Sequence, residues 1–167
     1  MNKKDDKKMT KDFDWEKYLI ECLESTEYCC LGTVDAGGVW TNPVYFAYDE
    51  KFDLYFISQM HSRHMQNLSK NPKVAVSIYS TEKKDDVFGI QLEGEAKILT
   101  EKDNGDEIQK AYEIYYGRAG HGVDIQGYMN NPTWLYVKIV LEHIYYFDTR
   151  FFGEERQEVP MKELINE

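Results

Sequence analysis

The sequence has few cysteines, too little positive charge and no long apolar run, and each shortage excludes a class of protein. Its three cysteines, Cys22, Cys29 and Cys30, cannot all pair within one chain, which argues against a disulfide framework and for a reducing, cytoplasmic compartment. No segment is long and apolar enough to cross a membrane, and the N-terminus lacks the apolar core of a signal peptide. Lys and Arg number 20 against 30 Asp and Glu, a net charge of −10, which argues against a general nucleic-acid binder.

What the sequence does contain points to one β-rich domain. The chain has 167 residues, 42% of them hydrophobic, with 13 tyrosines and 8 phenylalanines, and aromatic residues are enriched in strands. Residues 1–11 are charged and aperiodic, and residues 151–167 are mostly charged. We therefore predict a flexible N-terminal tail at 1–11, a single domain at 12–150 and a charged C-terminal tail at 151–167.

The hydrophobic pattern predicts the elements of this domain. The first three predicted strands follow one another as a meander, and Pro43 inside the second implies an edge strand, a bulge or a missing ladder bond. Gly94 marks a bend or a close backbone approach in the clearest strand. A meander with inserted helices suggests a closed or split barrel. The predicted strands are 28–34, 39–48, from Leu54, 74–79, 88–99 and 134–147, and helices are predicted from Asp14, from Ser62 to Asn71 and over 101–116, before a glycine-rich loop or lid at 117–132.

The stretch from Leu54 to Pro72 carries the clearest functional signal. A strand delivers the chain to a short helix whose first turn holds Ser62, Arg63 and His64. Free backbone N–H groups, an arginine fork and a serine hydroxyl suit a phosphate. This reading predicts a phosphate pocket, and its alternative is a capped surface helix with an exposed arginine.

Three segments together resemble the pyridoxamine 5′-phosphate oxidase-like superfamily. They are Tyr-Phe-Ala-Tyr-Asp-Glu-Lys-Phe-Asp-Leu-Tyr-Phe-Ile-Ser at 45–58, Ser-Arg-His-Met-Gln-Asn-Leu-Ser-Lys-Asn-Pro-Lys-Val-Ala-Val-Ser-Ile at 62–78 and Gln-Leu-Glu-Gly-Glu-Ala-Lys at 91–97. The resemblance is strongest over 28–99, and the ending at 134–148 resembles a poorly characterised branch of small flavin-barrel proteins. It implies a mainly β split barrel of the FMN-binding type with inserted helices. It also implies FMN as the cofactor and a homodimer with FMN between its subunits.

Carried over residue by residue, the resemblance implies a set of FMN-binding positions. The motif that grips the phosphate matches Ser62, Arg63 and His64, and the strand end beside the ribityl chain matches Ile57 and Ser58. The backbone that meets the ring matches Asn42, Pro43 and Val44, and Gln91 reaches the flavin from the next strand.

The chain also departs from the true oxidases of this superfamily. His64 stands where many members have lysine, so a fixed charge becomes a group that titrates near neutrality. Asn42 stands where the true oxidases have a basic residue, and their basic C-terminal motif is not visible. We therefore expect an FMN oxidoreductase that passes electrons from a reduced nicotinamide to a small acceptor, and not a pyridoxamine phosphate oxidase. The alternative is a non-catalytic flavin- or haem-binding or sensing protein of the same fold.

Other candidate sites have simpler explanations. Cys29 and Cys30 are neighbours on a strand, so their side chains point to opposite faces rather than toward each other. His61, His64 and His121 match no zinc spacing, although some barrels of this fold bind haem. Trp134 is more simply a core residue than a cover for a flavin. No nucleophile and base can be paired from the sequence, so no catalytic side chain is named.

Overall fold

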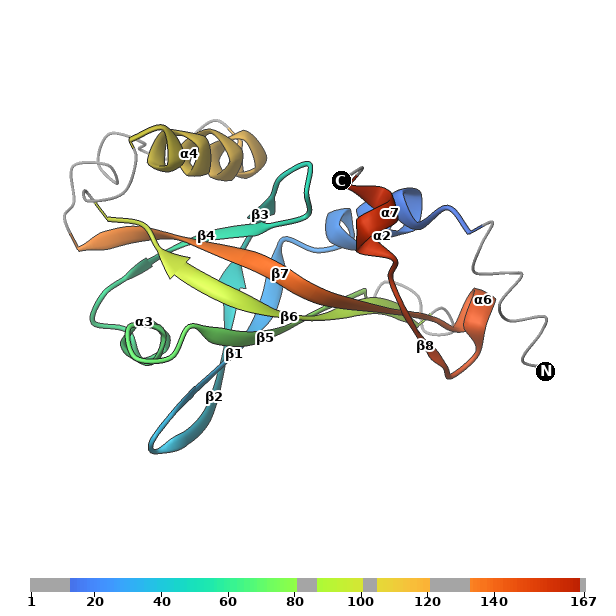
Figure 1. Cartoon of the computed structure of the whole chain (residues 1–167), viewed down its shortest axis with the longest axis horizontal. Coiled ribbons are helices and arrows are strands. Elements are labelled where there is room, and N and C mark those ends of the chain that lie inside the picture. Colours follow the sequence, from blue (N-terminus) through green and yellow to red (C-terminus); the bar gives the residue numbers. More distant parts are fainter. Residues whose placement is uncertain (1–12, 81–86, 101–104, 121–132, 166–167) are drawn as a thin grey trace.

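The structure, a computed structural model, describes residues 13–80, 87–100, 105–120 and 133–165 (Figure 1). Its strands are β1 (Tyr28–Asp35), β2 (Gly38–Tyr45), β3 (Ala47–Tyr48), β4 (Leu54–Gln59), β5 (Lys73–Tyr79), β6 (Phe88–Ile98), β7 (Trp134–Asp148) and β8 (Arg156–Glu158). Its helices are α2 (Trp15–Glu24), α3 (Arg63–Leu68), α4 (Gly105–Ala119), α6 (Thr149–Phe152) and α7 (Met161–Leu164).

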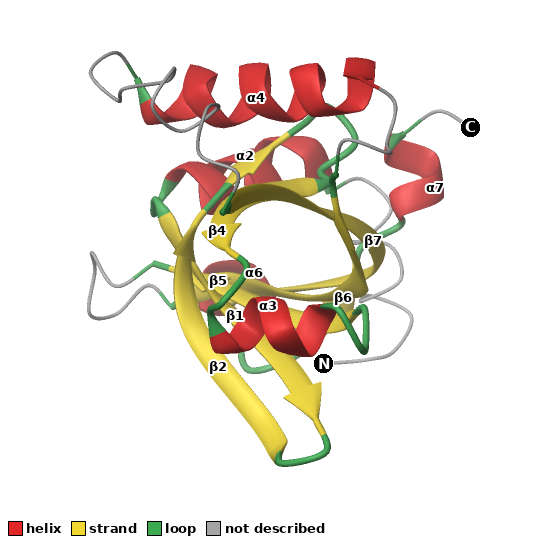
Figure 2. Ribbon diagram, turned by 90° about the vertical axis from the view of Figure 1, so that its left-hand side faces the viewer, coloured by secondary structure: helices red, strands yellow, loops and turns green. Residues whose placement is uncertain are grey.

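The strands form one antiparallel sheet that curls on itself. Their order is β2-β1-β5-β6-β7-β4-β3, with β8 added beside β7. Strands β2 and β3 stand at opposite ends of this order, yet only Phe46 separates them in the chain. The sheet must therefore bend until its two ends meet, and Figure 2 looks into the resulting barrel from one end. The predicted split β-barrel with inserted helices is confirmed.

Period-two alternation explains why the strands lie as they do. Along β6, Ile90, Leu92 and Ala96 are buried while Glu93 and Glu95 are exposed, as in a sheet with one face on the core. The ladder to β7 shifts between Glu93 and Gly94. A Cβ at Gly94 would lie 2.2 Å from the carbonyl oxygen of Val140. The predicted bend and close approach at Gly94 are therefore both present.

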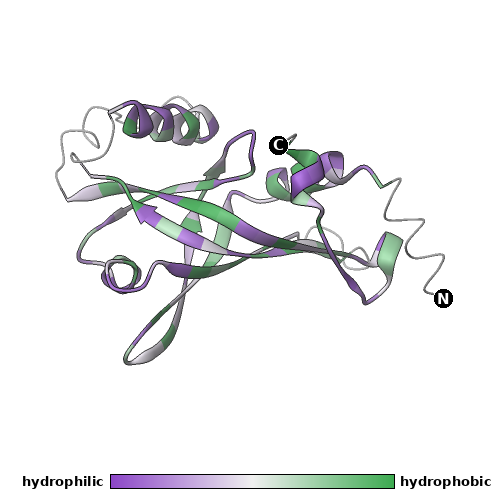
Figure 3. Ribbon diagram, in the orientation of Figure 1, coloured by the Kyte–Doolittle hydropathy of each residue, from purple (hydrophilic) through white to green (hydrophobic). Residues whose placement is uncertain are grey.

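Two helices cover different parts of the barrel, and the hydropathy colouring of Figure 3 shows their apolar stripes. Helix α2 buries Trp15, Leu19, Cys22 and Leu23 in the main core, the face that its spacing predicts. Helix α4 lies over β3, β4 and β7 and closes a second cluster that includes Tyr55, Leu99, Ala111, Tyr116 and Tyr136.

Several boundaries and pairings differ from the predictions. The predicted second strand breaks at Phe46 into β2, which pairs with β1, and β3, which pairs with β4. The antiparallel pairing expected of the meander is therefore present, but the break places its two hairpins at opposite ends of the sheet order. Helix α4 continues to Ala119, past the predicted start of the glycine-rich loop, and positions 101–104 and 121–132 lie outside the described residues. The chain after Arg150, expected as a charged tail, pairs with β7 through β8 and buries Phe152 and Val159 in the core.

Candidate functional site

Three polar side chains meet where β4 gives way to α3. Ser58 Oγ lies 2.7 Å from His64 Nε2 and 3.3 Å from Ser62 Oγ, and Ser62 Oγ lies 3.2 Å from the same imidazole nitrogen. Ser62 occupies the N-cap position of α3 but makes no side-chain capping bond, which leaves its hydroxyl for this group. We call Ser58, Ser62 and His64 the hydroxyl–imidazole cluster.

The cluster can present donors to an anion without carrying a charge of its own. Burial lowers the pKa of the His64 imidazole below its ordinary value, so the ring is neutral at pH 7. A neutral ring that donates from Nε2 to one hydroxyl oxygen frees the hydroxyl hydrogens to point at a ligand. His64 was expected to titrate near neutrality, and burial moves this titration to lower pH.

A hydroxyl 2.7 Å from an imidazole is also the contact by which a base activates a nucleophile. Such a pair needs a third group that orients the ring through its other nitrogen. Within the described part of the chain, His64 Nδ1 has no carboxylate partner. The geometry therefore favours ligand binding over nucleophilic catalysis.

Arg63 begins α3 beside the cluster but turns its side chain toward the β1–β2 hairpin. Its guanidinium lies 4.5 Å from the centre of the Trp40 ring and 3.9 Å from Asp35 Oδ1. Asp35 Oδ1 accepts from the Gly37 N–H, and with the buried Asn67 amide turned so that its oxygen accepts from Thr33, its nitrogen donates to Asp35 Oδ2. The 3.9 Å contact is long for an ion pair and the arginine side chain is 44% exposed. Its charge is therefore only partly compensated, and the guanidinium remains available for a ligand.

The ring-contact positions expected from the resemblance lie on β2, which is an edge strand as Pro43 predicted. Pro43 stands opposite Cys30, and the side chain of Val44 is buried in the core. Asn42 Oδ1 is buried and has no hydrogen-bond partner among the described residues. An unsatisfied buried acceptor is costly, so it is the atom on this strand that most needs a ligand.

The structure brings together only part of the predicted set. Ile57 lies next to Ser58 but packs its side chain against the aromatic cluster under α4. Gln91 pairs with Tyr145 of β7, whereas Ser58 pairs with Leu135, ten residues away on the same strand. At about 3.3 Å per residue, these positions are roughly 30 Å apart along β7. Gln91 is therefore not part of the hydroxyl–imidazole cluster.

Gln91 instead meets a residue that the sequence reading missed. Arg156 Nη1 donates to Gln91 Oε1 at 2.6 Å, because β8 places Arg156 beside β7. Arg156 belongs to the segment predicted as a charged tail, and only the pairing of β8 with β7 brings it to the sheet. No local sequence signal gives that pairing.

The remaining candidate sites can also be placed. Cys29 is buried and Cys30 exposed, on opposite faces as predicted, and burial raises the pKa of Cys29 to about 12. Among the described residues no three His, Cys, Asp or Glu side chains are grouped to hold a metal ion, and His121 lies outside them. Trp134 begins β7 opposite Gln59. No helix of the described ranges is long and apolar enough to cross a membrane.

The family of the chain follows from its sequence profile. The profile described as pyridoxamine 5′-phosphate oxidase matches residues 16–148, which include the hydroxyl–imidazole cluster and β7. The chain belongs to the pyridoxamine 5′-phosphate oxidase family. A UPF0306 protein of Campylobacter jejuni is 26% identical over 89 residues, which are 52% of this chain and 65% of that protein. This match thus spans less than two thirds of the relative's length.

Several solved structures share the fold of this chain, although their sequence identity to it is low. HutZ, the haem storage protein of Vibrio cholerae, superposes with a TM-score of 0.65 at 18% identity, covering 78% of this chain and 92% of HutZ. A haem-binding protein of Mycobacterium smegmatis gives 0.67 at 15% identity, covering 87% of this chain and 57% of that protein. General Stress Protein 26 of Bacillus anthracis gives 0.59 at 18% identity, covering 88% and 100%. At these identities the likeness shows the fold alone.

The described residues fit the flavin mononucleotide that the resemblance implies. Two hydroxyls, an imidazole and an arginine with a loose counter-ion surround the start of α3, and these are donors suited to a phosphate monoester. The orphaned Asn42 Oδ1 is an acceptor for the N–H or O–H groups that flavin carries. The chain thus offers both the donors expected for the phosphate and an acceptor expected near the flavin ring.

Proposed function

We propose that this chain binds FMN and acts as an oxidoreductase that passes electrons from a reduced nicotinamide to a small acceptor. The observation that carries the proposal is the convergence of Ser58, Ser62 and His64 beside Arg63 in a chain of the pyridoxamine 5′-phosphate oxidase family. A bound flavin would supply the hydride chemistry, and the protein would position it and tune its electronics.

Each group has a distinct part in the proposed site. Ser58 and Ser62 donate hydrogen bonds to phosphate oxygens, His64 orients both hydroxyls, and Arg63 supplies the positive charge. The free edge of β2 offers backbone groups to the ring near Asn42, whose buried oxygen accepts a hydrogen bond. Gln91 lies apart from these groups and is not part of the proposed phosphate site.

The homodimer implied by the resemblance belongs to the same proposal. Large apolar side chains stand in solvent on the β1–β2 hairpin and beside it, with Val39 77% and Tyr28 56% exposed. Exposed apolar groups of this size commonly mark an interface. Light scattering of the purified protein is expected to give twice the chain mass of 19.7 kDa, and a single-chain mass would contradict the dimer.

A visible absorption spectrum tests the proposed function. We expect the protein to retain flavin absorption after incubation with FMN and removal of the free cofactor, and to lose the flavin band under anaerobic conditions when NADH or NADPH is added. Retained flavin that neither nicotinamide bleaches would contradict the oxidoreductase role and leave a binder. No retained flavin would contradict the proposal altogether.

A second candidate function is haem binding, which two of the superposed structures favour by their names. Within the described residues its weakness is the lack of a free ligand at the cluster, since His64 Nε2 is engaged by both serines. Addition of haemin distinguishes the two functions. A sharp, stoichiometric Soret band in a protein that does not retain FMN would favour haem.

A further inference from the structure

A pocket on the outside of the barrel lies between β7, the turn from β3 to β4 and helix α7. It encloses about 380 Å³, within the roughly 300–1,000 Å³ usual for small-molecule sites. Lys138 lines it from β7 and pairs with Tyr55 of β4. Because side chains alternate along a strand, both stand on the face opposite Ser58. The pocket is therefore separate from the hydroxyl–imidazole cluster, and none of its described lining residues belongs to the expected FMN positions or to the β1–β2 hairpin.

The turn from β3 to β4 is held in a strained conformation at one edge of this pocket. Phe52 has a φ of 66°, in the left-handed region that residues other than glycine rarely adopt, while its ring is buried in the main core. Asp49 clamps the turn, because its Oδ1 accepts from the backbone N–H groups of Lys51 and Asp53, each at 3.0 Å. Strain of this kind commonly marks ligand sites. The fixed turn brings Lys51 and Asp53 to the pocket.

Lys138 is the cation whose place in the pocket is fixed. Its side chain is 19% exposed, and its Nζ lies 2.9 Å from Asp53 Oδ2. Asp53 Oδ1 accepts from the backbone N–H of Leu141 at 3.2 Å, so both oxygens of this carboxylate are occupied. An ammonium group has three N–H donors, and the ion pair with Asp53 uses one of them. Lys138 thus keeps donors for a ligand, although its charge is compensated.

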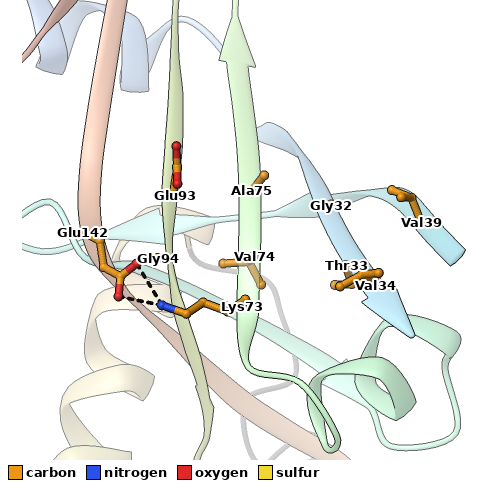
Figure 4. Close-up of a pocket in the computed structure, with 10 residues that line it drawn as sticks. All are labelled: Gly32, Thr33, Val34, Val39, Lys73, Val74, Ala75, Glu93, Gly94 and Glu142. Atoms are coloured by element: carbon orange, nitrogen blue, oxygen red, sulfur yellow. Dashed lines mark hydrogen bonds and ion pairs between the residues drawn. The ribbon is translucent and has the colours of Figure 1, made fainter. Parts of the chain in front are cut away.

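Two further lysines at the pocket have uncompensated charges. Among the residues that the structure describes, no carboxylate lies within ion-pair distance of Lys51 or Lys162. Glu142 also lines the pocket, but its carboxylate is held by Lys73 at 2.9 Å, as Figure 4 shows. In a protein with a net charge of −10, two such cations at one pocket attract an anion.

The rest of the pocket lining is aliphatic. Val140 projects from β7 with 45% of its surface exposed. Met161 and Ile165 line the pocket from α7 and its C-cap, and residues four apart on a helix share one face. No aromatic side chain is among the described lining residues, so a flat ring would have no partner for stacking. A saturated hydrocarbon chain matches this surface better.

We infer that this pocket binds a small aliphatic monocarboxylate, with its carboxylate held by Lys51 and Lys162 and its hydrocarbon chain on the aliphatic lining. A dianion suits the pocket less, because Asp53 and Glu142 line it as well. Binding of such a ligand needs neither a flavin nor a second subunit. This inference and the proposed function therefore succeed or fail independently.

The test is isothermal titration calorimetry of the purified protein with octanoate, its neutral analogue octanamide and the dianion octanedioate. We expect octanoate to bind more tightly than both. The double variant Lys51→Gln, Lys162→Gln is expected to weaken octanoate binding roughly tenfold or more, the scale of a lost charged hydrogen bond, and to leave octanamide binding unchanged. The matched double variant Lys17→Gln, Lys70→Gln removes the same charge from exposed positions away from the pocket and is expected to change neither.

A further substitution tests the aliphatic surface separately from the charge. Val140→Trp fills the pocket without altering any charge, and tryptophan suits a strand. It is expected to weaken octanoate and octanamide binding together, with an unchanged melting temperature as the check on folding. No binding of octanoate, equal affinity for octanoate and octanamide, equal effects of the two double variants, or tighter binding of octanedioate would each overturn the assignment.

Discussion

His64 is the residue whose behaviour depends most on its surroundings. From the sequence it is a histidine in a lysine position, and in the structure burial lowers its pKa while Ser58 and Ser62 engage its Nε2. The contact between His64 and Ser62 forms because Ser62 is the N-cap of α3 and has an extended backbone, so its hydroxyl reaches the imidazole two residues on. The contact with Ser58 depends on how tightly the chain turns after β4, which the sequence does not specify.

A pH prediction follows from this burial. The imidazole of the free protein is neutral above its lowered pKa, and a bound phosphate favours the protonated ring. FMN affinity is therefore expected to rise as pH falls below the pKa that the ring has in the complex, and to level off below the lowered pKa of the free protein. Affinity measured by flavin fluorescence from pH 8 to pH 5 checks this.

The phosphate of FMN itself gains a proton near pH 6, so the experiment needs a matched control. His64→Gln keeps a hydrogen-bonding side chain and removes the titration. The difference between the two profiles isolates the ring, and superimposable profiles would exclude His64 as the source.

The contacts of the Arg63 side chain cannot be predicted from the residues next to it in the sequence. The sequence predicts an arginine at the start of a helix, and the structure confirms the helix α3 from Arg63. Its partners Asp35 and Trp40 come from the β1–β2 hairpin, more than twenty residues earlier in the chain. Contacts of this kind depend on the closure of the sheet and cannot be read from local spacing.

At the scale of elements, hydrophobic periodicity correctly predicts most of the helices and strands. The alternation along 88–99 gives β6 and the spacing from Trp15 gives α2 almost to the residue. The errors occur where tertiary contacts override the local pattern. Phe46 turns inward and splits a predicted strand, and a segment of charged residues pairs as β8 because its partner β7 is long.

The bulge between β6 and β7 leads to a stability prediction. Gly94→Ala places a Cβ against the backbone oxygen of Val140, 2.2 Å away. Because that neighbour is backbone, the strands must separate locally, and we expect a loss of about 1–3 kcal/mol in the free energy of unfolding. Urea unfolding followed by circular dichroism measures it.

Gly117→Ala is the matched control for this substitution. Gly117 lies inside α4, and nothing lies within 4 Å of the Cβ it would gain. Alanine there is expected to stabilise the protein by up to about 1 kcal/mol, because glycine is the poorer helix former. Equal unfolding free energies for the two variants would contradict the role assigned to the bulge.

At the scale of the whole molecule, the fold follows from the sequence only in outline. Strand count, inserted helices and the resemblance predict a split barrel, and the structure confirms it. The order of strands does not follow, since β1 pairs with β5 across forty residues and β4 with β7 across eighty. For the same reason the sequence gives no sign of the contact between Gln91 and Arg156, which forms because β8 pairs with β7.

The negative net charge of the protein makes FMN binding depend on the proposed phosphate site. With a net charge of −10, the molecule as a whole repels an anionic cofactor, so binding must depend on local groups. In our account these are the hydroxyl–imidazole cluster and Arg63. The central claim is that they act on the phosphate of FMN and not on its ring.

The most direct test compares the affinities of FMN and riboflavin, which lacks the phosphate, for the native protein, Arg63→Ala and Lys70→Ala. Lys70 is exposed just beyond α3 and controls for the loss of one charge. We expect Arg63→Ala to weaken FMN binding by about 1.5–3 kcal/mol, roughly ten- to one-hundred-fold, with riboflavin affinity unchanged and Lys70→Ala close to native. An Arg63→Ala protein with native FMN affinity, or with equal losses for FMN and riboflavin, would contradict the account.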